Sequence, residues 1–226
     1  MTNLAHRLAA GTLAVLLLAS AAQAATVTYG PASFGPATTN WSDFLSLPKW
    51  DPALFPGQVL TGISFELEGD VEGNAAFESL DGAPATILMN LQATITLTDP
   101  SLNVLATVIP VANTVDNVTA FDGVTDFGGT SGKSYLGLTG SDSDTGNSID
   151  FPSFTGVGNI LLPITGTGTS NGSGAGNLVL QFSTMAAASA SITYTYQPVP
   201  EPASCLLAVI GALVLGLAAY KRRRSS

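Results

Sequence analysis

Histidine, cysteine and positive charge are almost absent from this chain of 226 residues, which has 7 Lys and Arg, 16 Asp and Glu, one His and one Cys. His6 and Cys205 lie near the two ends, so the interval 25–197 contains neither residue type. Two bases, Lys49 and Lys133, against fifteen acids give that interval a formal charge of −13. It therefore lacks a Ser-His-Asp or Cys-His nucleophile and the usual zinc ligands. We predict no catalytic residue and no cofactor. We also predict no nucleic-acid partner, because phosphate binding needs a basic face.

The first 24 residues have the three-part layout of a secretory signal peptide. After a weakly basic start, a mostly apolar run extends from Leu8 to Ala19, which is too short to cross about 30 Å of hydrocarbon. Ala22 and Ala24 provide the small residues of a signal-peptidase site. We expect signal peptidase to cut there, so that the mature chain begins near Ala25.

The last 29 residues, 198–226, combine a short motif at 199–202, an apolar run at 203–220 and a basic tail at 221–226. Eighteen residues give roughly 27 Å of helix at about 1.5 Å per residue, which just spans a bilayer. Basic flanks stay cytoplasmic, so we expect the interval 25–197 on the outer side of the inner membrane. The motif is Val199, Pro200, Glu201 and Pro202, and the cytoplasmic basic stop is Lys221, Arg222, Arg223 and Arg224.

A Pro-Glu-Pro tripeptide, a short apolar helix and a terminal arginine cluster, on a chain with a signal peptide, resemble the PEP-CTERM sorting signal. The resemblance implies recognition by exosortase, a membrane-embedded cysteine protease and transpeptidase that removes the helix. The implied route is an inner-membrane intermediate with a periplasmic domain, then the outer surface or the extracellular matrix of a biofilm. A plain tail anchor is the alternative. We interpret Cys205 as a small apolar residue at the membrane edge.

The interval 25–197 has no sustained helical period, but several stretches alternate apolar and polar residues, above all 85–98 and 189–196. Turn signals such as Asp81-Gly82 and Asp99-Pro100 separate the runs. The pattern predicts an all-β fold, an antiparallel β-sandwich or jelly roll, between the signal-peptide helix and the transmembrane helix. Shorter strands are expected at 26–29, 59–67, 74–80, 102–111, 113–121, 134–139, 158–163 and 177–184.

Five segments of this interval also resemble the choice-of-anchor surface domains, in particular type E. The resemblance covers 25–197 and implies an exported surface module with no assigned activity and no catalytic residues to carry over. The segments are 39–42, 45–52, 119–123, 126–132 and 192–196.

Three aspartates, Asp142, Asp144 and Asp150, lie in a segment that spaces oxygen ligands at alternate positions, as a calcium loop does. The segment departs from an EF-hand, because Asn147 takes the expected glycine position and Ser153 the position of the bidentate Glu. The three aspartates are a candidate calcium site, and a polar surface turn is the alternative interpretation.

Glu66, Glu68, Asp70 and Glu72 alternate along an expected strand, which would place all four on one face. A glycosidase needs two carboxylates about 5–10 Å apart in a cleft, one of them desolvated. A solvated edge that repels other sheet edges is the simpler interpretation.

Trp41 and Trp50 lie in a proline-rich opening of the interval. Exposed tryptophans would offer a stacking platform for sugar rings, whereas buried ones would cap the sandwich core, the interpretation we favour.

The sequence thus favours an exported, non-enzymatic protein of the cell surface or extracellular matrix. Its expected partners are signal peptidase, exosortase and, transiently, the inner membrane, with extracellular polysaccharide as a further candidate. A surface module that binds carbohydrate or calcium is the alternative function, and a carboxylate-only enzyme is a third.

Overall fold

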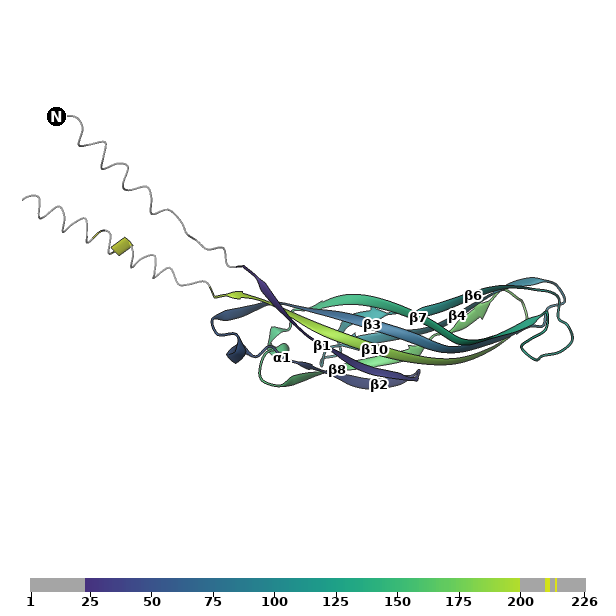
Figure 1. Ribbon diagram of the computed structural model, residues 1–226, viewed down its shortest axis with the longest axis horizontal. Helices are drawn as coiled ribbons and strands as arrows, with labels where there is room; N and C mark the ends of the chain where they lie inside the picture. The colour runs from purple at the N-terminus through teal and green to yellow at the C-terminus, as the bar shows by residue number, and fades with distance from the viewer. Residues whose placement is uncertain (1–22, 200–209, 212–213, 215–226) are drawn as a thin grey trace, which may run out of the picture. The chain divides into compact units, whose positions relative to one another are not determined.

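The computed structural model describes residues 23–199, 210–211 and 214 (Figure 1). The chain divides into two compact units, of which Ala25–Tyr196, here called the β domain, contains most of the described residues. Residues 1–24 and 197–226 form the other unit. Ala24 and Val199 are described and exposed, whereas Ala22, the rest of the sorting motif, nearly all of 203–220 and the basic tail lie outside the described residues. In the described ranges, no helix is long and apolar enough to span a membrane.

Ten strands and two very short helices make up the described fold. The strands are β1 (Ala25–Thr38), β2 (Trp41–Pro48), β3 (Gln58–Ser79), β4 (Ala85–Thr98), β5 (Val104–Val108), β6 (Val111–Val118), β7 (Gly132–Ser148), β8 (Asn159–Gly168), β9 (Asn171–Ser173) and β10 (Leu178–Pro198), and the helices are η1 (Pro52–Leu54) and α1 (Phe151–Phe154).

The strands form two sheets, which confirms the all-β antiparallel prediction. The first sheet has the order β1-β10-β3-β7, and the second has the order β2-β8-β4-β5. Strand β4 organises the second sheet, because one half of it pairs with β5 and β8 and the other half with β6 and β9. Every one of these β4 pairings is antiparallel, as are β1 with β10 and β3 with β7.

Several strands are longer than the alternation predicted. The two expected strands at 59–67 and 74–80 are one strand, β3, which continues through a register shift between Gly73 and Ala75. Gly73 has φ 155°, and a Cβ there would collide with the backbone oxygen of Ser183, so the bulge needs glycine. The runs 177–184 and 189–196 likewise belong to one strand, β10. A bulge hides continuity from a period-two pattern, because it shifts the inward positions by one residue.

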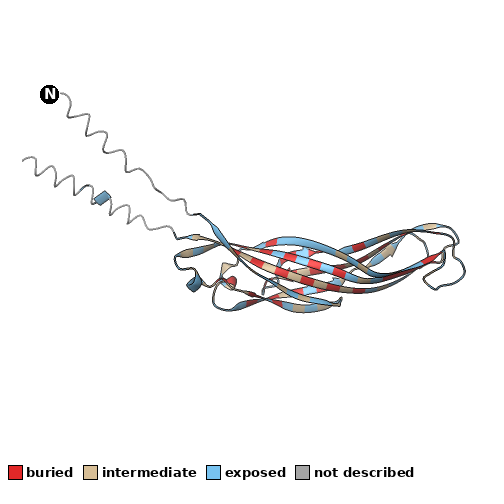
Figure 2. Cartoon of the chain, viewed as in Figure 1, coloured by how far each residue is buried: buried red, intermediate tan, exposed pale blue. Residues whose placement is uncertain are grey.

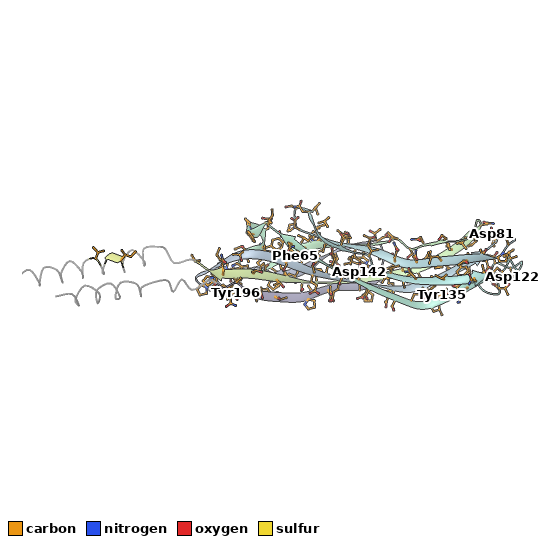
Figure 3. The ribbon with its side chains drawn as sticks, turned by 90° about the horizontal axis from the view of Figure 1, so that it is seen from above. Phe65, Asp81, Asp122, Tyr135, Asp142 and Tyr196 are labelled. Atoms are coloured by element: carbon orange, nitrogen blue, oxygen red, sulfur yellow. The ribbon has the colours of Figure 1, made fainter. Side chains whose placement is uncertain are left out.

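Buried side chains alternate with half-buried or exposed ones along the long strands (Figure 2). A large cluster between the sheets includes Trp50, Phe65, Leu67 and Tyr194. Phe77 belongs to a second, smaller cluster, with Ala75, Ile87, Met89 and Val118. Figure 3 shows Tyr196 and Phe65 toward one end of the domain and Tyr135, Asp81 and Asp122 toward the other. The hydrophobic core is therefore concentrated toward the end where the domain's first and last residues pair.

The two edges of the first sheet are protected in different ways. Pro31 and Pro36 lie in edge strand β1, where a residue without an N–H is tolerated, and the pairing with β10 shifts register beside each proline. The other edge strand, β7, contacts β5 and β6 of the second sheet. Neither edge presents a long, flat row of free backbone groups, which limits edge-to-edge association.

Candidate functional site

Four carboxylates line the outer face of the four-stranded sheet. Glu66, Glu68, Asp70 and Glu72 are all exposed, as β3 turns its alternate residues outward. This confirms the prediction that they share one face. The prediction of a sheet edge was wrong, because β3 lies between β10 and β7. The residues opposite them on β7 are hydroxylated: Thr145, Ser143, Ser141 and Thr139.

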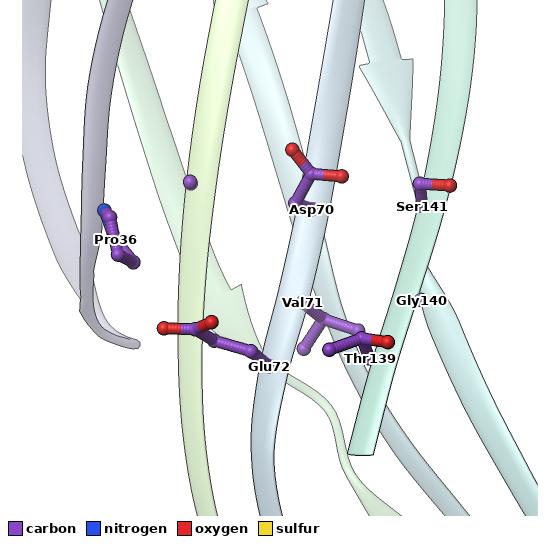
Figure 4. A pocket seen from close by; sticks show the side chains of 8 residues that line it. Pro36, Asp70, Val71, Glu72, Thr139, Gly140 and Ser141 are labelled. Carbon is purple, nitrogen blue, oxygen red and sulfur yellow. The ribbon is translucent and has the colours of Figure 1, made fainter. Parts of the chain in front are cut away.

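A groove lies at the end of this acidic row. It has a volume of about 440 Å³ and crosses all four strands of the first sheet (Figure 4). Glu72 extends from β3 toward Pro36 in this view. The lining residues are Pro36, Asp70, Val71, Glu72, Thr139, Gly140, Ser141 and Ala187.

The chemistry of the groove is that of hydrogen bonding. Asp70 and Glu72 offer carboxylate oxygens, and Thr139 and Ser141 offer hydroxyls that donate or accept. Both carboxylates are exposed to solvent, whereas a glycosidase requires one carboxyl that is desolvated and held protonated. The arrangement suits binding of a polyhydroxylated ligand better than acid catalysis.

Two aspartates of the candidate calcium site, Asp142 and Asp144, lie in strand β7, so the prediction of a loop or turn was wrong for the part of the segment up to Ser148. Asp150 lies beyond the end of this strand. Asp142 Oδ2 accepts the N–H of Ile109 at 2.8 Å, and Asp144 Oδ2 accepts the N–H of Thr107 at 3.1 Å. Asp150 instead caps α1 by accepting the N–H of Ser153. In the described ranges, no group of three or more His, Cys, Asp or Glu residues is placed to hold a metal ion.

Asp142 and Asp144 close one side of the sandwich. They share a face of β7 with Gly140 and Gly146, where a Cβ would collide with the backbone oxygens of Val111 and Leu105 respectively. Glycines at the two outer positions let the strands approach, and the carboxylates between them accept the N–H groups of Thr107, in β5, and of Ile109, just beyond its end. The alternating Gly-Asp-Asp-Gly spacing is a signal in the sequence that β7 approaches another strand closely. Nothing in the sequence identified which strand that is.

At the end opposite Tyr196, carboxylates hold the loop 119–131. Glu78 is fully buried and accepts the N–H of Phe127 at 2.9 Å and the hydroxyl of Ser131 at 2.6 Å. Asp122 accepts the N–H groups of Val124 at 3.1 Å and Thr130 at 3.2 Å. The hydrogen bond from Val124, and then that from Thr130, lower the pKa of Asp122 below its ordinary value.

Lys133 contributes the ion pair that joins β6 to β7. Its Nζ lies 2.6 Å from Asp116 Oδ1 and 4.8 Å from the ring centroid of Tyr135, whose hydroxyl also donates to Asp116. The hydrogen bond to Asp116 raises the pKa of Lys133. This lysine is therefore held in an ion pair that links the two strands.

The tryptophans contribute to packing. Trp50 is 2% exposed, and its ring stacks on Phe55 with centroids 3.8 Å apart, which confirms the preferred interpretation. Trp41 is half-buried against Phe34, with centroids 4.7 Å apart. Neither indole presents a free, flat platform for a sugar ring.

No protein-family model matches this chain, and neither does any curated protein. Among solved structures, the VP2 subviral particle of infectious bursal disease virus is 15% identical with a TM-score of 0.19, covering 80% of this chain and 38% of that one. The Gx strain of that virus gives 16% identity and a TM-score of 0.15, over 81% of this chain and 38% of that one. The tailspike of Acinetobacter baumannii phage AM24 gives 13% identity and 0.16, over 72% and 27%. The chain thus spans less than two fifths of the length of each of these proteins.

Proposed function

We propose that this chain is an exported, non-enzymatic protein of the cell surface or extracellular matrix, sorted and cut by exosortase through a PEP-CTERM signal. The observation that carries the proposal is the order of features after β10: the motif 199–202, the apolar run 203–220 and the basic tail 221–226. Signal peptidase would remove residues 1–24. What remains would be a sandwich of jelly-roll type that was held between two helices during export.

The position of the domain boundaries supports the proposal. The compact β domain ends at Ala25 and Tyr196, which pair with each other in the register of β1 and β10. Both processed segments would therefore leave the domain from the same end. Among the described residues, all members of the two buried clusters lie within 25–196, so removal of both segments would leave these clusters intact.

The chemistry of the domain supports a role without catalysis. It has no His or Cys, and its outward carboxylates are solvated. The fully buried Glu78 already accepts hydrogen bonds from Phe127 and Ser131. Its oxygens therefore stabilise the loop 119–131.

Cell fractionation with and without exosortase tests the sorting step. We expect the wild-type chain in the outer or extracellular fraction only when exosortase is present, and Glu201→Ala retained in the inner membrane in both strains. Glu72→Ala, which removes an exposed carboxylate elsewhere, should behave as the wild type. Identical distribution of the wild-type chain in both strains would refute the proposal.

Carbohydrate binding by the β domain is the second candidate, and the groove beside Asp70 and Glu72 favours it. Calorimetric titration of the purified chain with neutral oligosaccharides tests this. We expect at least about tenfold weaker binding after Asp70→Asn with Glu72→Gln, as one lost bidentate contact to a charged group has that effect. Glu66→Gln, outside the groove, is the matched control. Equal affinity in all three proteins would exclude the groove as the binding site.

A further inference from the structure

Three aliphatic side chains stand almost free in water on two loops of the β domain. Leu54 is 68% exposed, Ile149 92% and Val157 85%. Leu54 ends the short helix η1, and the other two flank α1. Single exposed aliphatic residues are ordinary on protein surfaces. What distinguishes these three residues is their position in the domain.

The two loops adjoin each other. Trp50 and Thr155 form a parallel bridge, and the N–H of Gly156 donates to the carbonyl oxygen of Trp50 at 2.8 Å. The N–H of Lys49 donates to the carbonyl oxygen of Gly158 at 2.9 Å. The loop with Leu54 is thus fastened to the loop with Val157.

Both loops lie at the end where the chain leaves the domain. The ring of Phe55, next to Leu54, is 5.0 Å from the ring of Tyr196, the last residue of the domain. Ser148, next to Ile149, pairs with Ile63, while Thr61 donates its hydroxyl to the carbonyl oxygen of Thr195. Figure 1 shows α1 at this same end of the sheets.

The connection from this end to the apolar run is short. Six residues, 197–202, separate Tyr196 from Ala203, and three of the six are prolines. A proline-rich segment extends about 3.1 Å per residue, so the seven steps from Tyr196 to Ala203 would cover roughly 22 Å. If 203–220 spans a bilayer, this end of the domain is within reach of the headgroups.

The acidic groups of the two loops are engaged locally. Asp51 accepts the N–H of Ala53 at the start of η1, and Asp150 caps α1. Lys49 adds a positive charge to the first loop. The domain as a whole is strongly acidic, so its affinity should be for a neutral lipid surface and should fall as anionic lipid is added.

We propose that Leu54, Ile149 and Val157 enter the headgroup region of the bilayer that anchors residues 203–220, so that the domain stands on this end until it is cut. The inference depends on the proposed function, because it needs the anchor. The occupant of this surface is a neutral lipid interface. Three side chains without an anchor give only weak, reversible attachment, so cleavage would also free the domain from the membrane.

Lipid-depth quenching tests the contact on the full chain in phosphatidylcholine vesicles. A fluorescent label is placed on Val157→Cys or on Leu136→Cys, each with Cys205→Ser. Leu136 is the matched control, because it is 83% exposed and follows Tyr135 toward the opposite end. A label on native Cys205, at the start of the apolar run, reports insertion of the anchor.

We expect headgroup-located quenchers to quench the label at 157 at least about threefold more than the label at 136. A quenched label at 205 with equal quenching at 157 and 136 would overturn this inference, while still supporting insertion of the anchor. An unquenched label at 205 would overturn the anchor and this inference together.

Proteolysis of the connecting segment provides a second test without labels. We expect Leu54→Asp with Val157→Asp to expose 197–202 to protease several-fold faster than in the wild-type chain in the same vesicles, because the domain lifts from the surface. Leu136→Asp should leave the rate unchanged. All three positions are exposed, so melting temperatures should agree among the variants. Equal cleavage rates in all three proteins would contradict the contact.

Discussion

The two ends of the β domain are ordered by different forces. At the end with Tyr196, aromatic rings pack together, and Trp50 lies within 6.1 Å of Phe55, Tyr194 and Tyr196 between ring centroids. At the other end the core is small, and the carboxylates of Glu78 and Asp122 hold a loop by accepting backbone N–H groups. The two ends therefore differ in the source of their order, which is burial of apolar side chains at one end and hydrogen bonding to carboxylates at the other.

Truncation of the Trp50 side chain, at the aromatic end, should have the largest effect on the stability of the domain. We expect Trp50→Ala to lower the free energy of unfolding by about 3–5 kcal/mol, because a buried Trp leaves a cavity as well as losing its transfer energy. Denaturant unfolding of the chain measures this, with the exposed Leu54→Ala as the control. A loss no larger than that of the control would mean that Trp50 does not organise this end.

Substitution of the buried carboxylate should have a moderate and local effect. Glu78→Gln replaces one acceptor oxygen with an NH2 group, so the N–H of Phe127 or the hydroxyl of Ser131 loses its partner. The expected cost is about 1–3 kcal/mol. Amide hydrogen exchange should accelerate across 119–131 and not around Trp50. Glu72→Gln, on an exposed carboxylate, should change neither, and uniform acceleration in Glu78→Gln would contradict a local role.

The close approach of β7 to β5 lies between the two ends of the domain, and it can be tested by adding a side chain at the contact. Gly146→Ala would push a Cβ into the backbone oxygen of Leu105, and overpacking of this kind costs about 1–3 kcal/mol. Gly82→Ala, where a Cβ meets open space, should be neutral. Equal melting temperatures for the two variants would show that β7 and β5 are not in close contact.

The pH dependence of the loop should be the smallest effect. The folded-state pKa of Asp122 is lowered, so its contribution is present above the unfolded pKa of about 3.9 and is lost as pH falls through the folded value. We expect exchange in 119–131 to accelerate at low pH before exchange near Trp50 does. Asp122→Asn should reduce this difference between the ends, and an unchanged difference would assign it to another carboxylate.

The sequence predicted the fold well where a strand is regular and where one of its faces is exposed to solvent. The alternation of 85–98 predicted β4 to the residue, and the four acids of β3 were predicted on one face. Strand β3 was split in the prediction because the bulge at Gly73 breaks the period. In the sequence this break looks like the end of a strand, and only the pairing with β7 shows that β3 continues.

The roles of individual carboxylates depend on distant partners. Asp142 and Asp144 were interpreted as loop residues because their spacing suits a calcium loop, but their oxygens accept the N–H groups of Ile109 and Thr107, which are more than 30 residues away in the sequence. Glu78 is fully buried, whereas Glu72 is exposed on the same strand. Nothing local distinguishes the two, because burial is decided by the loop that closes over Glu78.

The intact mass of the exported protein tests the sorting function most directly. Purified from the outer or extracellular fraction of cells with exosortase, the protein should begin near Ala25 and end before the apolar run that starts at Ala203. A mass that includes the chain through Ser226 in that fraction would contradict cleavage, and with it the proposal that this acidic domain is released from the membrane by its C-terminal signal.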